Sequence, residues 1–404
     1  MARYGRVIAI DDEQIVVRCD PSDLRFRDPA SRFISVVADR AELRRLGTDP
    51  SWRVGQLVDL ETSAVIRDPG LSAEYPGPGT EVMRMPPERI HHLVDRAQAL
   101  SKVRSFFAER GFLEVETPLL VPSPGLEIHL EAVPAGGGYL ITSPEYQMKR
   151  LLAAGFEKIY QVCKCFRANE RGVHHSSEFT MIEWYRAFDT IDAIRADTEQ
   201  LVHAVCGDHA RVGARTIDVR PPWPRMTVRE AMRRWAGVDV AGDEPAAELV
   251  RKVRAAGIEV AEDTAWDDAF FAAFLDRVDP AIAALDTALF LEDWPAPLAA
   301  LARRKDGDTR TALRFEAYIG GIELANAFDE LTDPEEQRAR FGDDLRIRAE
   351  RGKREYPLDE KLLAALAEGL PPSAGIALGF DRLVMLATGA HAIDQVLTFA
   401  GDEL

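Results

Sequence analysis

Hydrophobic and polar residues alternate in two segments on either side of a polar loop, a pattern that predicts a β-hairpin. The strands are expected at 159–167 and 179–185. Side chains two apart share a face of a strand, so one face is expected to carry Gln161, Cys163, Cys165, Arg167, Phe179, Met181, Glu183 and Tyr185. The loop that ends at Glu178 is long enough for a hairpin to favour a functional role.

Similar patterns divide the N-terminal part of the chain. Residues 1–68 contain four short segments of strand type and a short helix at 41–47, which predict a small β-barrel of the oligonucleotide-binding type. Residues 69–87 are rich in proline and glycine, as a linker would be. An amphipathic helix is expected at 88–110, ended by Gly111.

The remaining elements follow from turn and capping signals. Residues 112–125 predict a strand broken at Pro118, and 141–155 predict a turn leading into a helix. Residues 189–303 are alanine-rich and are expected to form a mostly helical insertion with a scaffold role. Residues 314–331 predict a hairpin about a Gly-Gly turn, and 373–389 predict a small-residue strand that runs into a helix.

Two residues of the second hairpin raise a question of strand parity. Glu323 and Asn326 are three apart, so a regular strand points them to opposite faces. Both reach one site only if the strand bulges or ends there. Glu330 follows, just before a helix that Thr332, Asp333 and Pro334 are expected to open.

Composition narrows the class of protein. The net charge of −17 argues against a large nucleic-acid footprint. Residues 1–84 hold 12 arginines and 14 acids, a net of −2, and they do not indicate a nucleic-acid surface. Four cysteines do not make a disulfide framework. The chain shows no signal peptide and no apolar run of about 18 residues, so a cytoplasmic protein is expected.

Several side chains suggest a site for a nucleotide beside a cationic substrate. Arg167 offers a rigid donor fork for a phosphate, and Phe179 offers a face for a base. His174 and His175 add donors, whereas Glu183 and Tyr185 suit an ammonium group. Arg382 lies in the first turn of a helix, where a phosphate is favoured, and Gly375 and Gly379 allow a ligand close to the backbone. A solvated hairpin with a surface Arg–Glu pair remains the alternative from these residues alone.

Three segments, in this order, resemble the catalytic core of class II aminoacyl-tRNA synthetases. Residues 112–120 resemble motif 1, which builds a dimer interface in that family, 166–185 resemble motif 2, and 375–386 resemble motif 3. SPEYQMKRLL, EFTMIEWY and ELANAFDELTD are similar to the lysyl branch, and more closely to its truncated paralogues that attach (R)-β-lysine to elongation factor P. The resemblance implies an α+β catalytic domain over 88–404, with an antiparallel sheet flanked by helices, and a homodimer that uses ATP and Mg²⁺.

The resemblance also implies roles for single residues. Arg167, Arg382 and Glu323 would be catalytic, with Glu323 as the Mg²⁺ ligand. The implied ATP contacts are Arg167, Asn169, Glu170, His175, Ser176, Phe179, Glu323, Leu324, Gly379 and Arg382. The implied contacts to a lysine-like substrate are Ser143, Pro144, Glu145, Glu183, Tyr185, Asn326, Glu330 and Ala377.

Three functions are compatible with these features. The first is activation of lysine or (R)-β-lysine and its transfer to elongation factor P, and the second is charging of tRNA as a lysyl-tRNA synthetase. The third is an inactive regulator that kept the fold. Ala377 stands where the tRNA-charging enzymes have glycine, and its methyl group favours the β-isomer and hence the first function. The retained Arg167, Phe179, Glu323 and Arg382 disfavour the third.

Overall fold

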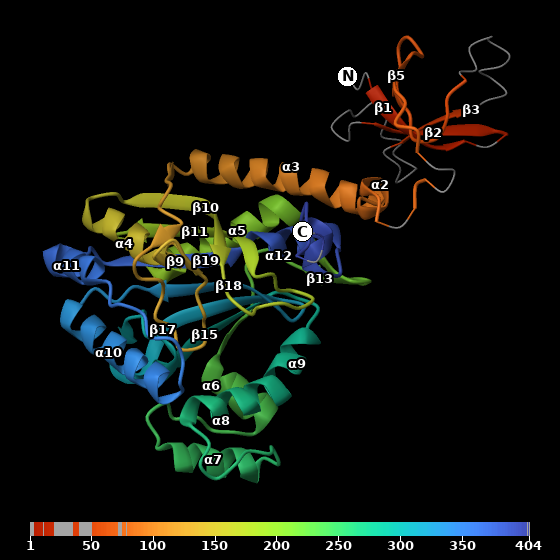
Figure 1. Ribbon diagram of the computed structural model, residues 1–404. Helices are drawn as coiled ribbons and strands as arrows, with labels where there is room; N and C mark the ends of the chain where they lie inside the picture. Colours follow the sequence, from red (N-terminus) through yellow and green to blue (C-terminus); the bar gives the residue numbers. More distant parts are fainter. Residues whose placement is uncertain are drawn as a thin grey trace. The chain divides into compact units, whose positions relative to one another are not determined.

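The computed structural model describes residues 4–10, 12–19, 35–39, 51–71, 75–77, 79–401 and 403. It contains two compact units, Met1–Gln98 and Ala99–Leu404, and Figure 1 shows both. The boundary falls inside helix α3, Pro87–Glu109, which corresponds to the helix expected at 88–110. Within the part of the chain that the structure describes, no helix is long and apolar enough to cross a membrane.

The first unit contains a five-stranded antiparallel sheet in the order β3-β2-β1-β4-β5. Its small core is formed by Val7, Ile15, Val17, Cys19 and Val58. The small N-terminal β domain is therefore confirmed, although the ladders among the described residues do not close into a barrel. The helix expected at 41–47 lies outside the described residues. The elements are β1 Tyr4–Ile10, β2 Gln14–Cys19, β3 Ser35–Asp39, β4 Leu57–Asp59, β5 Val65–Arg67 and α2 Glu81–Arg84.

The second unit is built on a large, mainly antiparallel sheet in the order β14-β15-β17-β18-β19-β11-β10-β6, with β16 paired to β17. This arrangement confirms the fold class that the motifs predict. The strands of the sheet are β6 Leu113–Glu114, β10 Lys158–Phe166, β11 Glu178–Ala187, β14 Arg225–Thr227, β15 Leu289–Pro295, β16 Arg304–Lys305, β17 Asp308–Ile319, β18 Ile322–Asp329 and β19 Ser373–Gly379. Smaller sheets hold β7 Leu120–Val121, β8 Pro134–Ala135, β9 Gly138–Leu140, β12 His209–Val212 and β13 Arg215–Asp218.

Helices cover the large sheet in two groups (Figure 1). On one face, α5, α12 and the second half of α3 pack on Ile182 and Trp184 of β11 and on Ile376 and Leu378 of β19. A second core joins α4, α10 and α11 to Tyr185. The helices are α4 Glu145–Ala153, α5 Ile191–Cys206, α6 Val228–Ala231, α7 Ala246–Ala255, α8 Trp266–Ala273, α9 Asp279–Ala283, α10 Pro334–Glu350, α11 Glu360–Gly369 and α12 Phe380–Thr388.

The β10–β11 hairpin forms as the alternation predicts. Gln161 pairs with Glu183, Cys163 with Met181 and Cys165 with Phe179, so these residues share one face of the sheet. The even-numbered residues Ile182 and Trp184 are fully buried in the helical core on the opposite face. The sheet therefore separates an apolar face from a polar one.

The parity question at Glu323 and Asn326 is answered by a β-bulge. Asn326 pairs with Glu316 and Ala325 with Ala317, but Glu323 pairs with Tyr318, so Leu324 has no partner on β17. One extra residue reverses the alternation. Leu324 is buried in the apolar core, and both polar residues line the same cavity on the other face.

The segment 189–303 is only in part an insertion. Helices predominate in it, as predicted, and they form a core of their own with residues such as Val250, Phe270 and Trp294. However, β14 and β15 from this segment extend the large sheet beside β17, and α5 packs on its apolar face. The segment is thus built into the second unit.

Two glycine variants test the tight turn of the β17–β18 hairpin. Gly320 and Gly321 have φ of +57° and +87°, and a Cβ on Gly321 would lie 2.6 Å from that of Ala283. Gly321→Ala is therefore expected to lower the free energy of unfolding by more than about 1 kcal/mol. Gly342→Ala, in α10 with no neighbour within 4 Å, is expected to raise it by about 1 kcal/mol. Urea unfolding measures the free energy of unfolding of both variants. Equal changes in the two variants would contradict the conclusion that the turn requires glycine at position 321.

Candidate active site

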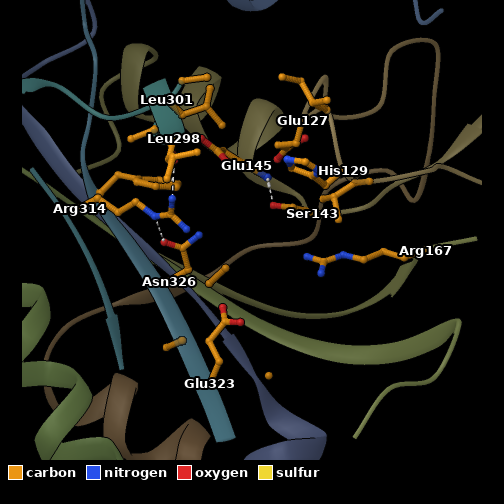
Figure 2. Close-up of a pocket in the computed structure, with 18 of the residues that line it drawn as sticks. Glu127, His129, Ser143, Glu145, Arg167, Leu298, Leu301, Arg314, Glu323 and Asn326 are labelled. Atoms are coloured by element: carbon orange, nitrogen blue, oxygen red, sulfur yellow. Dashed lines mark hydrogen bonds between the residues drawn. The ribbon is translucent and has the colours of Figure 1, made fainter. Parts of the chain in front are cut away.

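A cavity of about 660 Å³ lies on the polar face of the large sheet. Figure 2 shows side chains from several strands and loops pointing into it. It brings together most of the residues singled out from the sequence, which come from distant parts of the chain. Its wall includes Ser143, Glu145, Arg167, Glu170, His174, His175, Ser176, Phe179, Glu183, Tyr185, Glu323, Leu324, Asn326, Glu330, Gly375, Ala377, Gly379 and Arg382.

Two predicted contacts lie outside this wall. Pro144 precedes α4, and its carbonyl accepts hydrogen bonds from the backbone N–H groups of Gln147 and Met148, so the residue acts in the helix start. Asn169 turns the loop after β10 with φ of +65°, a conformation that asparagine tolerates. Their contacts to a substrate or to ATP stay predictions.

The floor of the cavity is one face of strand β19, and this face carries almost no side chains. On β19, Gly375 pairs with Tyr185 and Ala377 pairs with Glu183. A Cβ on Gly375 would lie 2.2 Å from Cε1 of Tyr185 and 2.7 Å from Oε1 of Glu330, so this position accepts only glycine. The small residues let flanking side chains close over β19 and hold a ligand against its backbone.

One end of the cavity carries two arginines. The Arg167 guanidinium lies 5.1 Å above the ring of Phe179 and only 3.7 Å from Glu170, and its buried Nε has no hydrogen-bond partner among the described residues. Arg382 donates to the carbonyl of Glu323 at 2.5 Å and to Nε2 of His175 at 2.7 Å. Arg167 is therefore free to bind an anion, whereas Arg382 is already fixed in position between two segments of the chain.

The other end carries three buried glutamates around one lysine. The Lys149 ammonium lies 2.6 Å from Glu145 and 2.7 Å from Glu330. Glu183 accepts hydrogen bonds from the hydroxyls of Ser143 and Tyr185, both at 2.6 Å. Oε1 of Glu330 is buried without a hydrogen-bond partner in the described part of the chain. Since a buried carboxylate oxygen normally has a donor, this atom is suited to an ammonium group of a ligand.

Burial controls the protonation of this acidic end. It raises the pKa of both Glu183 and Glu330 to about 8, and the nearby charge of Glu145 adds to the effect. Burial alone would lower the pKa of Lys149, but the carboxylates of Glu145 and Glu330 outweigh it and raise that pKa. A ligand cation would favour the ionised carboxylates and reverse their shift.

The Glu323 carboxylate offers a metal ligand beside the arginine end, and Glu316, which does not line the cavity, lies close to it. Glu323 lines the cavity, and burial together with the charge of Glu323 raises the pKa of Glu316 to about 7. No group of three or more candidate metal ligands occurs among the described residues. Mg²⁺ needs only one or two carboxylates when phosphate oxygens and water complete its shell, so Glu323 fits this ion together with a nucleotide.

Several wall residues were not predicted from the sequence. Lys149, which does not line the cavity but pairs with Glu145 and Glu330 of its wall, was not predicted either, because a lysine inside an amphipathic helix usually lies on its solvent face. Arg314 donates to Oδ1 of Asn326 at 3.0 Å and also contacts Glu316 and the carbonyl of Leu298, as Figure 2 shows in part. Its place two residues before Glu316, which pairs with Asn326 in the hairpin, was the available signal. Glu127, Trp266 and Leu298 belong to no motif that sequence reasoning identified.

Comparison with known proteins gives one consistent answer. The family model for tRNA synthetases class II (D, K and N) matches residues 83–403. An elongation factor P--(R)-beta-lysine ligase of Klebsiella pneumoniae subsp. pneumoniae is 40% identical over 329 residues, which cover 78% of this chain and 97% of the relative. Ligases with the same name from Proteus mirabilis and Salmonella dublin are also 40% identical, with 96% and 97% of their lengths covered.

Removal of Lys149 tests the buried ion pairs that it forms with Glu145 and Glu330. Lys149→Met leaves Glu145 and Glu330 without their buried counter-ion, so we expect a loss of about 3–5 kcal/mol in unfolding free energy at pH 9. Adding Glu330→Gln is expected to recover part of this loss, and the loss is expected to be smaller at pH 7, where Glu330, with its pKa of about 8, is mostly protonated. Urea unfolding followed by tryptophan fluorescence measures each change.

A surface pair serves as the control for this experiment. Lys164 lies 3.3 Å from Glu178, and both side chains are largely exposed. Lys164→Met is expected to cost less than about 1 kcal/mol. A loss in Lys149→Met as small as that would show that Lys149 does not neutralise the glutamates.

Proposed function

We propose, because this chain belongs to the class II tRNA synthetase family (D, K and N), that it activates lysine or (R)-β-lysine with ATP and transfers the acyl group to a lysine of elongation factor P. Membership of this family makes the protein an ATP-dependent ligase. The named relatives supply the substrate class and the acceptor. The observation that carries the proposal is the single cavity with a free arginine at one end and a cluster of buried glutamates at the other.

The first step is attack of the substrate carboxylate on the α-phosphorus of ATP. It needs no covalent intermediate with the enzyme, only alignment of the two substrates and stabilisation of the charge on the pentacoordinate phosphorus. Arg167 has the open guanidinium that this charge requires, and the ring of Phe179 beside it offers a face for adenine. Arg382 is held by His175 and Glu323, and we assign it to the triphosphate side.

Magnesium would be held by Glu323, with Glu316 next to it. When bound, the ion supplies positive charge to the phosphate oxygens. Arg314 and Tyr318 orient Glu316, since the Tyr318 hydroxyl donates to it at 2.5 Å and Arg314 contacts its other oxygen. The chain itself therefore fixes the Glu316 carboxylate in place beside Glu323.

The acidic end fits a substrate with two ammonium groups. Three glutamates against one lysine leave a formal excess of two negative charges at full ionisation. A diamino acid matches this excess, and an analogue that lacks one amine leaves a buried carboxylate unpaired. Ala377 lies between Glu183 and Asn326 in the sheet, so its methyl group narrows the floor at the substrate, which favours the β-isomer.

The acceptor, the oligomeric state and the compartment rest on similarity. The relatives are named for elongation factor P, and we propose the same acceptor here, in the cytoplasm where translation takes place. The residues that resemble motif 1, 112–120, include strand β6, Leu113–Glu114, and the first residue of β7, Leu120–Val121. Exposed side chains of Leu113 and Leu120 there support the proposal of a homodimer.

An acceptor comparison tests the assignment directly. The enzyme is incubated with ATP and labelled lysine or (R)-β-lysine, and with either elongation factor P or tRNA. We expect label on elongation factor P, a preference for (R)-β-lysine and none on tRNA. Arg167→Ala is expected to lose at least about a thousandfold in pyrophosphate exchange, because it removes the cation at the α-phosphate. Charging of tRNA instead would identify a lysyl-tRNA synthetase, and no exchange with any amino acid would indicate an inactive protein.

Substrate binding is also expected to depend on pH. The pKa values of Glu183 and Glu330 near 8 mean that both carboxyls are mostly protonated at pH 7 in the empty cavity. An ammonium ligand binds the ionised forms, so affinity should rise between pH 6 and 8 by up to about tenfold per pH unit for each proton released. Titration calorimetry in two buffers of different ionisation enthalpy measures the number of protons released when the ligand binds. A binding enthalpy that is the same in both buffers would contradict the raised pKa values of Glu183 and Glu330. The Glu183→Gln variant should release fewer protons on binding than the wild type.

A further inference from the structure

The acyl transfer step needs a proton acceptor that the adenylation site does not provide. A lysine side chain is protonated near neutral pH, and only its neutral amine attacks a carbonyl carbon. A general base beside the activated acyl group therefore has to remove a proton. This argument rests on the proposed function, in which the acceptor is a lysine of another protein.

Most acidic groups of the cavity already have partners. Glu145 and Glu330 are paired with Lys149, and Glu183 is held by the hydroxyls of Ser143 and Tyr185. The unpartnered Oε1 of Glu330 is the atom that we assign to a substrate ammonium. These groups surround the substrate ammonium positions deep in the cavity. Glu323 lies at the arginine end, next to the carbonyl that fixes Arg382. None of them is free to face an incoming amine.

Glu127 differs from these acids in its contacts. It lines the cavity from the loop that precedes β8, and its buried Oε2 has no hydrogen-bond partner among the described residues. Its charge interacts with those of Glu145 and Arg167, which we assign to the substrate amine and to the α-phosphate. The acyl carbon of the adenylate would join the groups bound at these two positions, and Figure 2 shows Glu127 at the cavity wall near Glu145 and His129.

The same wall also reaches solvent. His129 is two residues from Glu127, lines the cavity and has half of its side chain exposed. It lies 3.6 Å from Asp267 and packs edge-on against Phe271 of α8, residues that also line the cavity. An acceptor on another protein has to enter from a solvent-open side, and this side leads it to Glu127 before it meets the buried glutamates.

We propose that Glu127 is the general base of the transfer step and that the acceptor lysine approaches along the wall formed by His129, Asp267 and Phe271. The acceptor ammonium gives one proton to the Glu127 carboxylate. Its nitrogen then attacks the acyl carbon, the bond from that carbon to the phosphate oxygen breaks, and AMP leaves with the bonding electrons. The second proton is lost from the new amide nitrogen to solvent.

The electrostatic surroundings of Glu127 suit this role. Burial is the largest cause of its raised pKa, and the charge of Glu145 adds to it, so the group is a stronger base than an exposed glutamate. Arg167 and Lys149 act in the opposite direction. The charged or titratable groups that face it are Glu145, Tyr146 and Lys149 of α4, Arg167 after β10, and Asp344 of α10.

A single-turnover experiment separates this role from adenylation. The full-length enzyme is loaded with lysyl-adenylate in the presence of pyrophosphatase and is then mixed with elongation factor P over a range of pH. We expect Glu127→Gln to lower the transfer rate by about 100-fold and to abolish the rise of that rate with pH in the wild type. Glu127→Asp should restore part of both. Glu248→Gln, an exposed acid-to-amide change on α7, is the matched control and should behave as the wild type.

A second acceptor distinguishes a base from a structural role. Hydroxylamine is largely neutral at pH 7, so it needs no base, and Glu127→Gln should form the hydroxamate at nearly the wild-type rate. Equal losses with hydroxylamine and with elongation factor P would overturn the proposal, as would loss of the pH-dependent rise in His129→Gln instead of Glu127→Gln. If the wild type forms the adenylate but modifies no elongation factor P, the proposed function fails and this inference fails with it. If the wild type transfers and Glu127→Gln transfers equally well, only this inference fails.

Discussion

The site depends on one constraint, the nearly bare surface of strand β19. Gly375, Ala377 and Gly379 face the cavity, and their neighbours on the adjoining strands carry the chemistry. Glu183, Ala377, Asn326 and Glu316 form one row across four strands. Larger residues on β19 would fill the space that a substrate needs, as the contact of a Cβ on Gly375 with Tyr185 shows. The apolar face of the same strand, with Ile376 and Leu378, packs on helices and keeps this floor rigid.

A rigid floor matters because the site gathers like charges. Glutamates in a dry pocket repel each other and favour protonation, and Lys149 offsets only part of this cost. The remaining imbalance is resolved when a ligand brings its own ammonium groups. The arginine end has an excess of positive charge, because Arg167 has only a loose ion pair with Glu170 at 3.7 Å and its buried Nε has no hydrogen-bond partner among the described residues. Each end is thus incomplete by itself, and the two substrates complete the charge balance together, which favours their joint binding.

Sequence reasoning could predict the elements better than the contacts. Alternation located the β10–β11 hairpin, and the Gly320–Gly321 turn located the second one, because both signals are local. The bulge at Leu324 could be predicted only as one of two possibilities, because no local signal distinguishes a bulge from the end of a strand. Lys149 and Glu127 could not be found in this way, because their importance comes from burial beside residues far away in the chain. The strands β14 and β15 were not predicted, because they are short and lie in an alanine-rich segment. They are stabilised only by their place at the edge of the large sheet.

The segment 189–303 also contributes residues to the wall of the cavity. Trp266, Asp267 and Phe271 of α8 line the cavity, and Arg351 after α10 holds Asp267 through two hydrogen bonds of 2.8 and 2.7 Å. His129 touches the same helix. Three segments distant in sequence therefore meet at the wall that we assign to the acceptor, whereas the segments that resemble motifs 2 and 3 build the side that we assign to adenylate formation. Because the two sides are made by different parts of the chain, we expect changes in acceptor recognition to leave the activation chemistry intact.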